Sequence, residues 1–355
     1  MSFTARLAAA ASRAYGLFGA ISAAVDPYFQ YVVALLHGDG TNGAQNNTFL
    51  DSSTNNFTIT RNGNTTQGSF SPFSQKGWGN YFDGSSILTF ASSVNYTGGS
   101  GEFCLECFFY PTSISADRWM IGNRNGNYVP FAINYPGTVS ADSLLFYMSS
   151  NGVSWDVVNG TYVKGVFQNQ WNHLALVRNS SNQIVCYLNG LGTTLATSAA
   201  NFSTAQPMYV GGSPSGSDVD FLGYISNARF IKGSNPYTGA TITVPTSPLT
   251  AVTNTQLLTS QSNRFLDNST NAVTPSITGT PSVQPISPFY ATTAYSTASV
   301  GGSGYFDGSG DYLSVANSND FDTNSTFTLE CWYYQPSSGN ATFFSRGGGT
   351  ADWNT

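Results

Sequence analysis

Four cysteines, three glutamates and two histidines are the residues of this 355-residue chain whose types suit redox, metal or acid-base chemistry. Cys104 and Cys107 form a Cys-x-x-Cys pair in the stretch FCLECFFYP, a spacing found in redox and metal sites. The alternation of this stretch predicts a strand, and successive side chains of a strand point to opposite faces. Three residues of strand separate the two Cα atoms by about 10 Å, beyond the ~7 Å limit of a disulfide. We therefore expect neither a disulfide nor a shared metal, and we expect Cys107 to be a small core residue.

The acidic residues and histidines do not form a catalytic constellation either. A glycosidase needs two carboxyl groups, roughly 5 Å apart for retention of configuration. The glutamates, Glu102, Glu106 and Glu330, form no acidic cluster. His173 alternates with apolar residues, which is typical of a sheet histidine, and neither it nor His37 accompanies a Gly-x-Ser-x-Gly motif. The sequence predicts no catalytic residues and a protein that is not an enzyme.

The amino-acid composition limits the kinds of molecule that the chain is expected to bind. Only 8% of the residues are charged, against ~25% in an average soluble domain, and Asn, Ser, Thr and Gly carry the polarity instead. The net charge is −6 and no Lys/Arg cluster is present, so we expect no nucleic-acid binding. No stretch approaches ~18 uninterrupted apolar residues, so we expect no membrane span.

Residues 1–28 are Ala-rich and differ from the rest of the chain. Their apolar residues alternate in steps of four and three, which predicts a short helix with a heptad seam formed by Phe3, Leu7, Ala10, Ala14, Leu17 and Ile21. Pro27 ends the helix. We interpret the segment as an attachment or oligomerisation element, compatible with a homotrimer. Packing on its own domain and a cleaved signal peptide are the alternatives.

From Phe29 onward the pattern is one of short alternating strands. In WNHLALVRNSSNQIVCYLNG, Trp171 to Arg178 alternate, NSSNQ turns the chain, and Ile184 to Leu188 return. Asn189-Gly190 is the preferred pair for a type I′ turn, whose two central residues need positive φ. The sequence predicts antiparallel sheet built from hairpins.

An internal repeat organises this all-β region. NTFLDSSTN at Asn47 recurs as NRFLDNSTN at Asn263, an offset of 216 (263 − 47), and YFDG at Tyr81 recurs at Tyr305, an offset of 224 (305 − 81). Cys331 is then the counterpart of Cys107, and we expect it to be buried. The repeat predicts three parts: a helical anchor over 1–28, a first domain over 29–250 and an incomplete second domain over 251–355. We expect the natural protein to continue, or the second domain to be completed by strands from elsewhere.

These motifs carry a family resemblance. The stretches EFCLECFFYP, WNHLALVRNSSNQIVCYLNG and MYVGGSPSGSDVDFLGYISNARFIKG resemble the laminin G-like, concanavalin A-like lectin/glucanase jelly roll. ALLHGDGTNG, FLDSSTNNFTIT and YISNARFIKGSNPYTGATITVPTSPLT resemble the tandem jelly-roll modules of structural proteins of tailed, notably marine, bacteriophages. The implied fold is a tandem array of jelly-roll sandwiches after a short N-terminal α-helix.

The resemblance also implies where ligands would bind. Lectin-like jelly rolls often hold calcium in loops, which makes Asp218 and Asp220 of SGSDVDF candidate ligands. Trp155 beside Asp156 suits a sugar ring, apolar on its face and hydroxylated at its edge. The alternative is that these aspartates cap turns.

The implied function is that of a virion structural protein, assembled in the host cytoplasm and acting outside the cell. In this hypothesis the N-terminal segment binds other virion proteins, and the jelly rolls of a tail or baseplate fibre contact a host-surface glycan or protein. A capsid decoration or head-fibre protein is the alternative. A secreted bacterial adhesin or carbohydrate-binding module is the alternative from another class, and a glycosidase would need a further domain.

Overall fold

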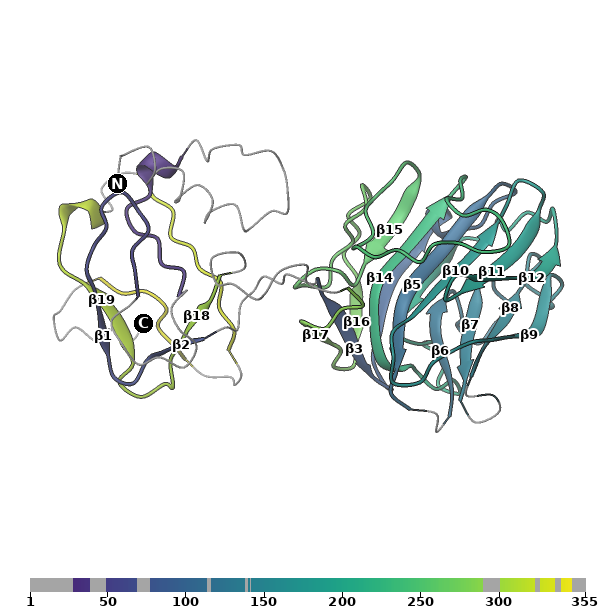
Figure 1. Cartoon of the computed structure of the whole chain (residues 1–355), viewed down its shortest axis with the longest axis horizontal. Coiled ribbons are helices and arrows are strands. Elements are labelled where there is room, and N and C mark those ends of the chain that lie inside the picture. Colours follow the sequence, from purple (N-terminus) through teal and green to yellow (C-terminus); the bar gives the residue numbers. More distant parts are fainter. Residues whose placement is uncertain are drawn as a thin grey trace.

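The computed structural model describes residues 28–38, 49–68, 77–113, 116–137, 140, 142–289, 301–322, 326–335 and 340–346. These residues form two bodies (Figure 1). The larger body comprises residues 77–289, and the smaller body combines residues 28–68 with residues 301–346. The six seam residues of the predicted anchor lie outside the described residues. Among the residues described, no helix is long and apolar enough to cross a membrane.

Two antiparallel sheets pack face to face in the larger body (Figure 1). The first sheet has eight strands in the order β12-β11-β10-β5-β14-β3-β17, with β15 also paired to β14. Their bounds are β3 Gly79–Asp83, β5 Phe103–Pro111, β10 Asn172–Arg178, β11 Gln183–Leu188, β12 Leu191–Thr197, β14 Leu222–Lys232, β15 Thr255–Thr259 and β17 Ser282–Gln284. The fold class predicted from the sequence is confirmed: this is an all-β sandwich.

The second sheet has seven strands in the order β16-β4-β13-β6-β7-β8-β9. Their bounds are β4 Ile87–Ser93, β6 Asp117–Gly122, β7 Ala132–Pro136, β8 Ser143–Met148, β9 Val158–Lys164, β13 Gln206–Val210 and β16 Ser276–Thr278. A 3-10 helix, η3 (Val94–Tyr96), follows β4. Every pairing of named strands in both sheets is antiparallel.

Strand β5 shows how the sequence builds the core. Its alternate residues Phe103, Leu105, Cys107 and Phe109 are fully buried between the sheets. Cys104 lies on the other face of the same strand, in a separate apolar cluster with residues such as Val177 and Tyr187. The prediction that the two thiols point to opposite faces is confirmed, and both are free.

The hairpin of β10 and β11 forms where the sequence predicts it. Leu174 pairs with Leu188 and Arg178 with Ile184. Asn189 and Gly190 have φ of 51° and 90°, the two positive values of the predicted type I′ turn. This turn joins β11 to β12, where Leu188 is opposite Leu191, so local turn chemistry fixes the register of that second hairpin.

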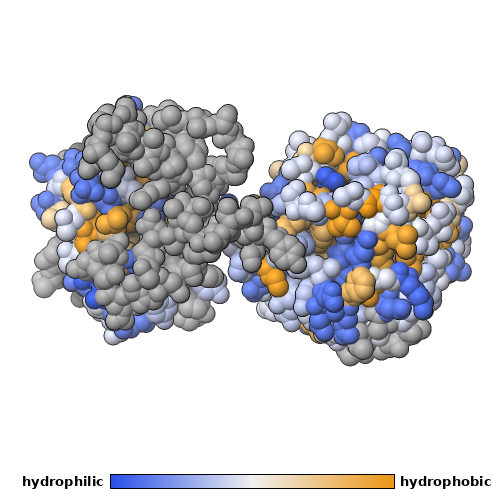
Figure 2. All heavy atoms as spheres, in the orientation of Figure 1, coloured by the Kyte–Doolittle hydropathy of each residue, from blue (hydrophilic) through white to orange (hydrophobic). Residues whose placement is uncertain are grey.

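The surface of the larger body carries few charges. Figure 2 shows hydrophobic residues of its visible face lying between hydrophilic ones. This mixture agrees with a composition in which only 8% of the residues are charged.

The smaller body brings together distant parts of the chain. Strand β1 (Ile59–Asn62) pairs with β19 (Tyr312–Val315), and β2 (Thr66–Gly68) pairs with β18 (Ser303–Tyr305). Two 3-10 helices, η2 (Phe29–Tyr31) and η4 (Asn319–Phe321), also belong to it. The division into domains at residue 250 stays a prediction, and the structure adds that β15, β16 and β17, which follow this boundary, complete the sheets of the larger body.

The expectation that Cys331 is buried was wrong. Cys331 is exposed, and so are its neighbours Phe327, Leu329 and Tyr333, at 61–65%. The reason is the lack of strand partners: β5 lies between β10 and β14, whereas no described strand pairs with residues 327–335.

Candidate functional site

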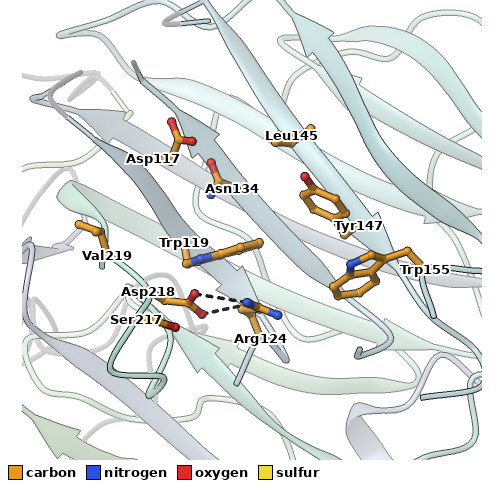
Figure 3. Close-up of a pocket in the computed structure, with 10 residues that line it drawn as sticks. All are labelled: Asp117, Trp119, Arg124, Asn134, Leu145, Tyr147, Trp155, Ser217, Asp218 and Val219. Carbon is orange, nitrogen blue, oxygen red and sulfur yellow. Dashed lines mark hydrogen bonds and ion pairs between the residues drawn. The ribbon is translucent and has the colours of Figure 1, made fainter. Parts of the chain in front are cut away.

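A hollow lies on the outer face of the second sheet, the face that points away from the core (Figure 3). Its volume is about 540 Å³. Strands β6, β7 and β8 form its floor, and the loops after β8 and β13 form its walls. The lining residues are Asp117, Trp119, Arg124, Asn134, Leu145, Tyr147, Trp155, Ser217, Asp218 and Val219.

Strand alternation places the floor residues. On β8, Phe146 and Met148 are fully buried in the core, so Tyr147 between them points outward. On β6, Met120 is in the core and Trp119 points outward. Trp119 is directly opposite Asn134 on β7, and the three outward side chains therefore share one surface.

Aromatic rings line one side of the hollow. The ring centroids of Trp119 and Tyr147 are 6.2 Å apart, and those of Tyr147 and Trp155 are 5.2 Å apart. Tyr128 extends the row, with its centroid 5.0 Å from that of Trp155. Trp119, Tyr147 and Trp155 are partly exposed, so their rings are open to a ligand.

A charged pair forms the opposite side (Figure 3). Arg124 donates from Nε to Asp218 Oδ2 at 3.0 Å and from Nη2 to Oδ1 at 3.3 Å. The guanidinium also lies over the Trp119 ring, 4.8 Å from its centroid. Asp218 is fixed further by Ser213, whose hydroxyl donates to Oδ2 at 2.7 Å. Bidentate pairing and stacking hold the guanidinium in one orientation.

Asn134 presents a hydrogen-bond acceptor at the floor. The residue is 5% exposed, and its Oδ1 atom accepts no hydrogen bond from the described residues. A buried acceptor without a partner costs roughly 1–3 kcal/mol. The atom has less than 1 Å² of accessible surface, so a bound hydroxyl group can donate to it only when the side chain turns toward the hollow.

The structure brings together two of the four loop residues singled out in the sequence. Trp155 and Asp218, 63 residues apart (218 − 155), line the same hollow. Asp156 instead caps a turn, accepting from the Ser150 backbone N–H at 2.8 Å and from its hydroxyl. Asp220 does not line the hollow, and its Oδ1 accepts from the Ser213 N–H at 2.9 Å.

Asp220 has an unusual environment for a carboxyl group. Burial raises its pKa from 3.8 to about 6, and the negative charges of Asp218 and Asp83 act in the same direction. The Ser213 N–H and the charge of Arg118 oppose this shift only in part. In the described part of the chain, no group of three or more His, Cys, Asp or Glu side chains is placed to hold a metal ion.

Sequence reasoning missed Trp119, Tyr147 and Arg124. Tyr147 stands between two core residues of its strand and Trp119 directly precedes one, so the alternation itself marks both as facing outward. The sequence does not state which strands are neighbours, and for that reason it did not join these rings to Trp155.

A second polar cluster lies on the outer face of the first sheet and is closed to solvent. The Glu106 and His173 side chains are fully buried. Glu106 Oε1 accepts from Arg229 Nε at 2.8 Å and Nη2 at 2.6 Å, and Oε2 accepts from the Tyr237 hydroxyl at 2.7 Å. His173 Nε2 lies 3.5 Å from Oε2, and its ring packs on Phe108.

These contacts determine the ionisation of Glu106. Burial by itself raises the pKa of its carboxyl, but the contact with His173, the charge of Arg229 and the Tyr237 hydroxyl outweigh burial, so that the pKa is lowered below 4.5. Glu106 is thus a structural carboxylate whose oxygens are already engaged.

Comparison with known proteins agrees with this architecture. Residues 82–235 match the family model of the concanavalin A-like lectin/glucanases superfamily. The larger body is an all-β sandwich, and over this stretch it is similar to a concanavalin A-like jelly roll. Its matched stretch runs from β3 to just beyond β14 and includes the hollow. No curated protein matches the chain.

Solved structures resemble this jelly roll at low identity. The mouse laminin alpha1 chain, domains LG4-5, is 18% identical over 44% of this chain and 41% of that one, with a TM-score of 0.33. A putative carbohydrate binding protein from Bacteroides ovatus is 13% identical over 59% and 60%, with a TM-score of 0.39. A pentraxin from Limulus polyphemus is 13% identical over 45% and 79%, with a TM-score of 0.34. The chain spans less than two thirds of the mouse and Bacteroides proteins.

Proposed function

We propose that the larger body is a carbohydrate-binding module and that its hollow holds the sugar. The observation that carries this proposal is the pairing of an aromatic row with a buried, unpartnered acceptor, Asn134 Oδ1. The family match over residues 82–235 supports it.

The geometry assigns a role to each side of the hollow. The apolar face of a sugar ring packs against Trp155 and Tyr147, and a ring hydroxyl donates to Asn134 Oδ1 once that side chain turns toward the hollow. Arg124, held by Asp218, presents its remaining N–H groups to sugar oxygens. Because only 8% of the residues of the chain are charged, the module is suited to neutral glycans.

Glycan binding is tested with two matched variants. Wild type, Trp155→Ala and Phe167→Ala are applied to a panel of immobilised neutral oligosaccharides, and the Kd of each hit is measured by calorimetry. Loss of the Trp155 ring is expected to weaken binding at least tenfold, about 1.4 kcal/mol. Phe167 is 54% exposed and lies outside the hollow, so its variant is expected to bind as wild type does. Equal binding by all three proteins, or no hit in the panel, would contradict the proposal.

We further propose that this module belongs to a phage virion structural protein, a tail or baseplate fibre attached through residues 1–28. The internal repeat and the low-charge surface support this role, as does the resemblance of the repeated motifs to phage modules. Quantitative mass spectrometry of purified particles tests it. A few to tens of copies per particle are expected, and hundreds of copies would contradict a fibre.

The calcium assignment to Asp218 and Asp220 stays part of the proposal. Binding of the ion requires Asp218 to turn from Arg124. Calcium is then expected to raise the Tm of wild type but not of Asp218→Asn, and an equal response of both proteins would contradict this assignment.

A further inference from the structure

Two segments of the chain have the same internal architecture. We name the described residues 33–38 and 49–68 the first donor segment and residues 256–284 the second donor segment. Each contains an aspartate that closes a loop: Asp51 accepts from the backbone N–H groups of Leu35, Ser53 and Phe57 at 2.8–2.9 Å. Asp267 accepts from those of Leu258, Ser269 and Val273 at 2.9–3.1 Å.

The equivalence extends to neighbouring side chains. Ser53 donates to Asp51 Oδ2, and Ser269 donates to Asp267 Oδ2. Asn55 donates from Nδ2 to the Val33 carbonyl at 3.1 Å, and its counterpart Asn271 donates to the Gln256 carbonyl at 2.9 Å. The repeated FLDSST and FLDNST motifs therefore encode one preorganised loop that occurs twice.

Each donor segment also supplies two strands to an acceptor, which we define as a YFDG strand and the strand that follows it. The second segment places β17 on β3 and β16 on β4, and the first places β2 on β18 and β1 on β19 (Figure 1). The registers coincide. Ser276 is opposite Thr89, and Thr60 is opposite Ser314. The two pairs are equivalent in the repeat, because the donor residues are 216 positions apart in the sequence (276 − 60) and the acceptor residues are 225 positions apart (314 − 89).

The turn between the donor strands docks in the same way in both bodies. The Thr280 N–H donates to Ser86 Oγ at 2.9 Å, and the equivalent Asn64 N–H donates to Asp311 Oδ1 at 2.6 Å. The preceding glycines, Gly279 and Gly63, have φ of 71° and 66°. A Cβ on Gly63 would lie 2.1 Å from Asp311 Oδ1, so the close approach depends on glycine.

The pairing is crossed with respect to the sequence. The first donor segment precedes β3 by about ten residues, yet it pairs with the acceptor that follows residue 301. The second donor segment precedes β18, yet it pairs with the acceptor formed by β3 and β4. Each acceptor therefore pairs with the donor segment of the other repeat. The donor segment of its own repeat has the same register and could form the same pairs.

We infer that the donor segments are interchangeable, and that the acceptor formed by β3 and β4 binds the first donor segment of a second copy of this chain. Three features of the first donor segment match those of the second: the cross-strand register, the turn contact and the glycine before it. The two donor segments form the same strand pairs and the same turn contact, so their exchange between copies resembles domain swapping, which links chains at low cost. The acceptor is a strand-addition site, and the second chain is its partner.

The test uses full-length chains in which the exposed Cys331 is replaced by serine. One version carries Thr60→Cys and an affinity tag, and the other carries Thr89→Cys and a different tag. The two are unfolded and refolded together, oxidised, and examined for a disulfide between chains by non-reducing electrophoresis. Pairing of Thr60→Cys with Ser181→Cys, an exposed hairpin position outside the acceptor, measures random collision.

The Thr60–Thr89 link between chains is expected to exceed the Thr60–Ser181 link at least tenfold. Adding Gly63→Ala to the donor chain is expected to reduce it to the level of the control. The variant Ser276→Cys/Thr89→Cys is expected to form a bond within one chain, which shows that the acceptor cysteine reacts in the observed register. A Thr60–Thr89 link no stronger than the control, or no bond between positions 276 and 89, would overturn the inference.

Discussion

Replacing Glu106 by glutamine is expected to destabilise the larger body severely. The carboxylate is the counter-charge of Arg229, and the two side chains are 0% and 7% exposed. Glutamine preserves the shape but leaves the guanidinium buried without a negative partner. Removing one member of a buried pair costs about 3–5 kcal/mol. Since a whole domain is stable by only about 5–15 kcal/mol, this loss is large.

A variant that lacks both charges separates the contribution of the ion pair to stability from the contribution of side-chain packing. The double variant Glu106→Leu/Arg229→Met leaves no buried charge of this pair and deprives the Tyr237 hydroxyl of its acceptor. We expect a cost of about 1–3 kcal/mol, because the Tyr237 hydroxyl loses its acceptor and the partly buried Thr250 carbonyl loses the Arg229 Nη1 donor. The double variant should therefore be more stable than either single variant, Glu106→Gln or Arg229→Met.

The measurement is urea-induced unfolding followed by tryptophan fluorescence at pH 7 and at pH 4. The folded pKa of Glu106 is lowered below 4.5, so its contribution is complete above pH 4.5 and is lost as the pH falls through the lowered pKa. The gap between wild type and Glu106→Gln should thus shrink at low pH. Glu102→Gln, one residue before β5 and partly exposed, serves as the control. A loss below about 1 kcal/mol for Glu106→Gln, or a double variant less stable than both single variants, would refute this reasoning.

Three further predictions concern turns and a second carboxyl group. Because the folded pKa of Asp220 is raised from 3.8 to about 6, its stabilising effect is present below pH 3.8 and is lost as the pH rises through 6. Asp220→Asn should therefore gain stability over wild type between pH 4 and pH 8 in urea unfolding, by about 1 kcal/mol because solvent screens this half-exposed carboxyl, and a constant difference would contradict the assignment. Gly190→Ala should lower the free energy of unfolding by about 1–2 kcal/mol, because φ is 90° and the new Cβ lies 2.8 Å from the Ile242 carbonyl; an unchanged Tm would argue against the turn. Asp267→Asn should accelerate hydrogen exchange at the Leu258 and Val273 amides, while protection like that of wild type would show that the loop does not depend on the carboxylate.

Features that depend on residues adjacent in the sequence could be predicted. The type I′ turn at Asn189-Gly190 depends on two adjacent residues, and the opposite facing of Cys104 and Cys107 depends on the period of a strand. Both were predicted because no distant residue alters them. The repeat was likewise visible, because similar residues recur in the same order.

Contacts between residues far apart in the sequence could not be predicted. Trp155 and Asp218 were singled out from their own loops, but the hollow that joins them depends on β6, β7 and β8 lying side by side. Arg229 was not recognised as the partner of Glu106, since 123 residues separate them. Cys331 was expected to be buried on the assumption that its strand has the neighbours of β5, which are a property of the sheet and not of the strand.

The crossed pairing of the donor segments sets an order of events during synthesis. The first donor segment leaves the ribosome just before β3 and β4, whereas β16 begins 183 residues after β4 ends (276 − 93). At about 5–20 residues per second, that delay is roughly 10–40 s. Loop closure favours the nearby segment during this interval. If the donor segments are interchangeable, the first donor segment closes the jelly roll temporarily and β16 and β17 then displace it. The rate of maturation would then depend on how quickly the first donor segment dissociates from β3 and β4.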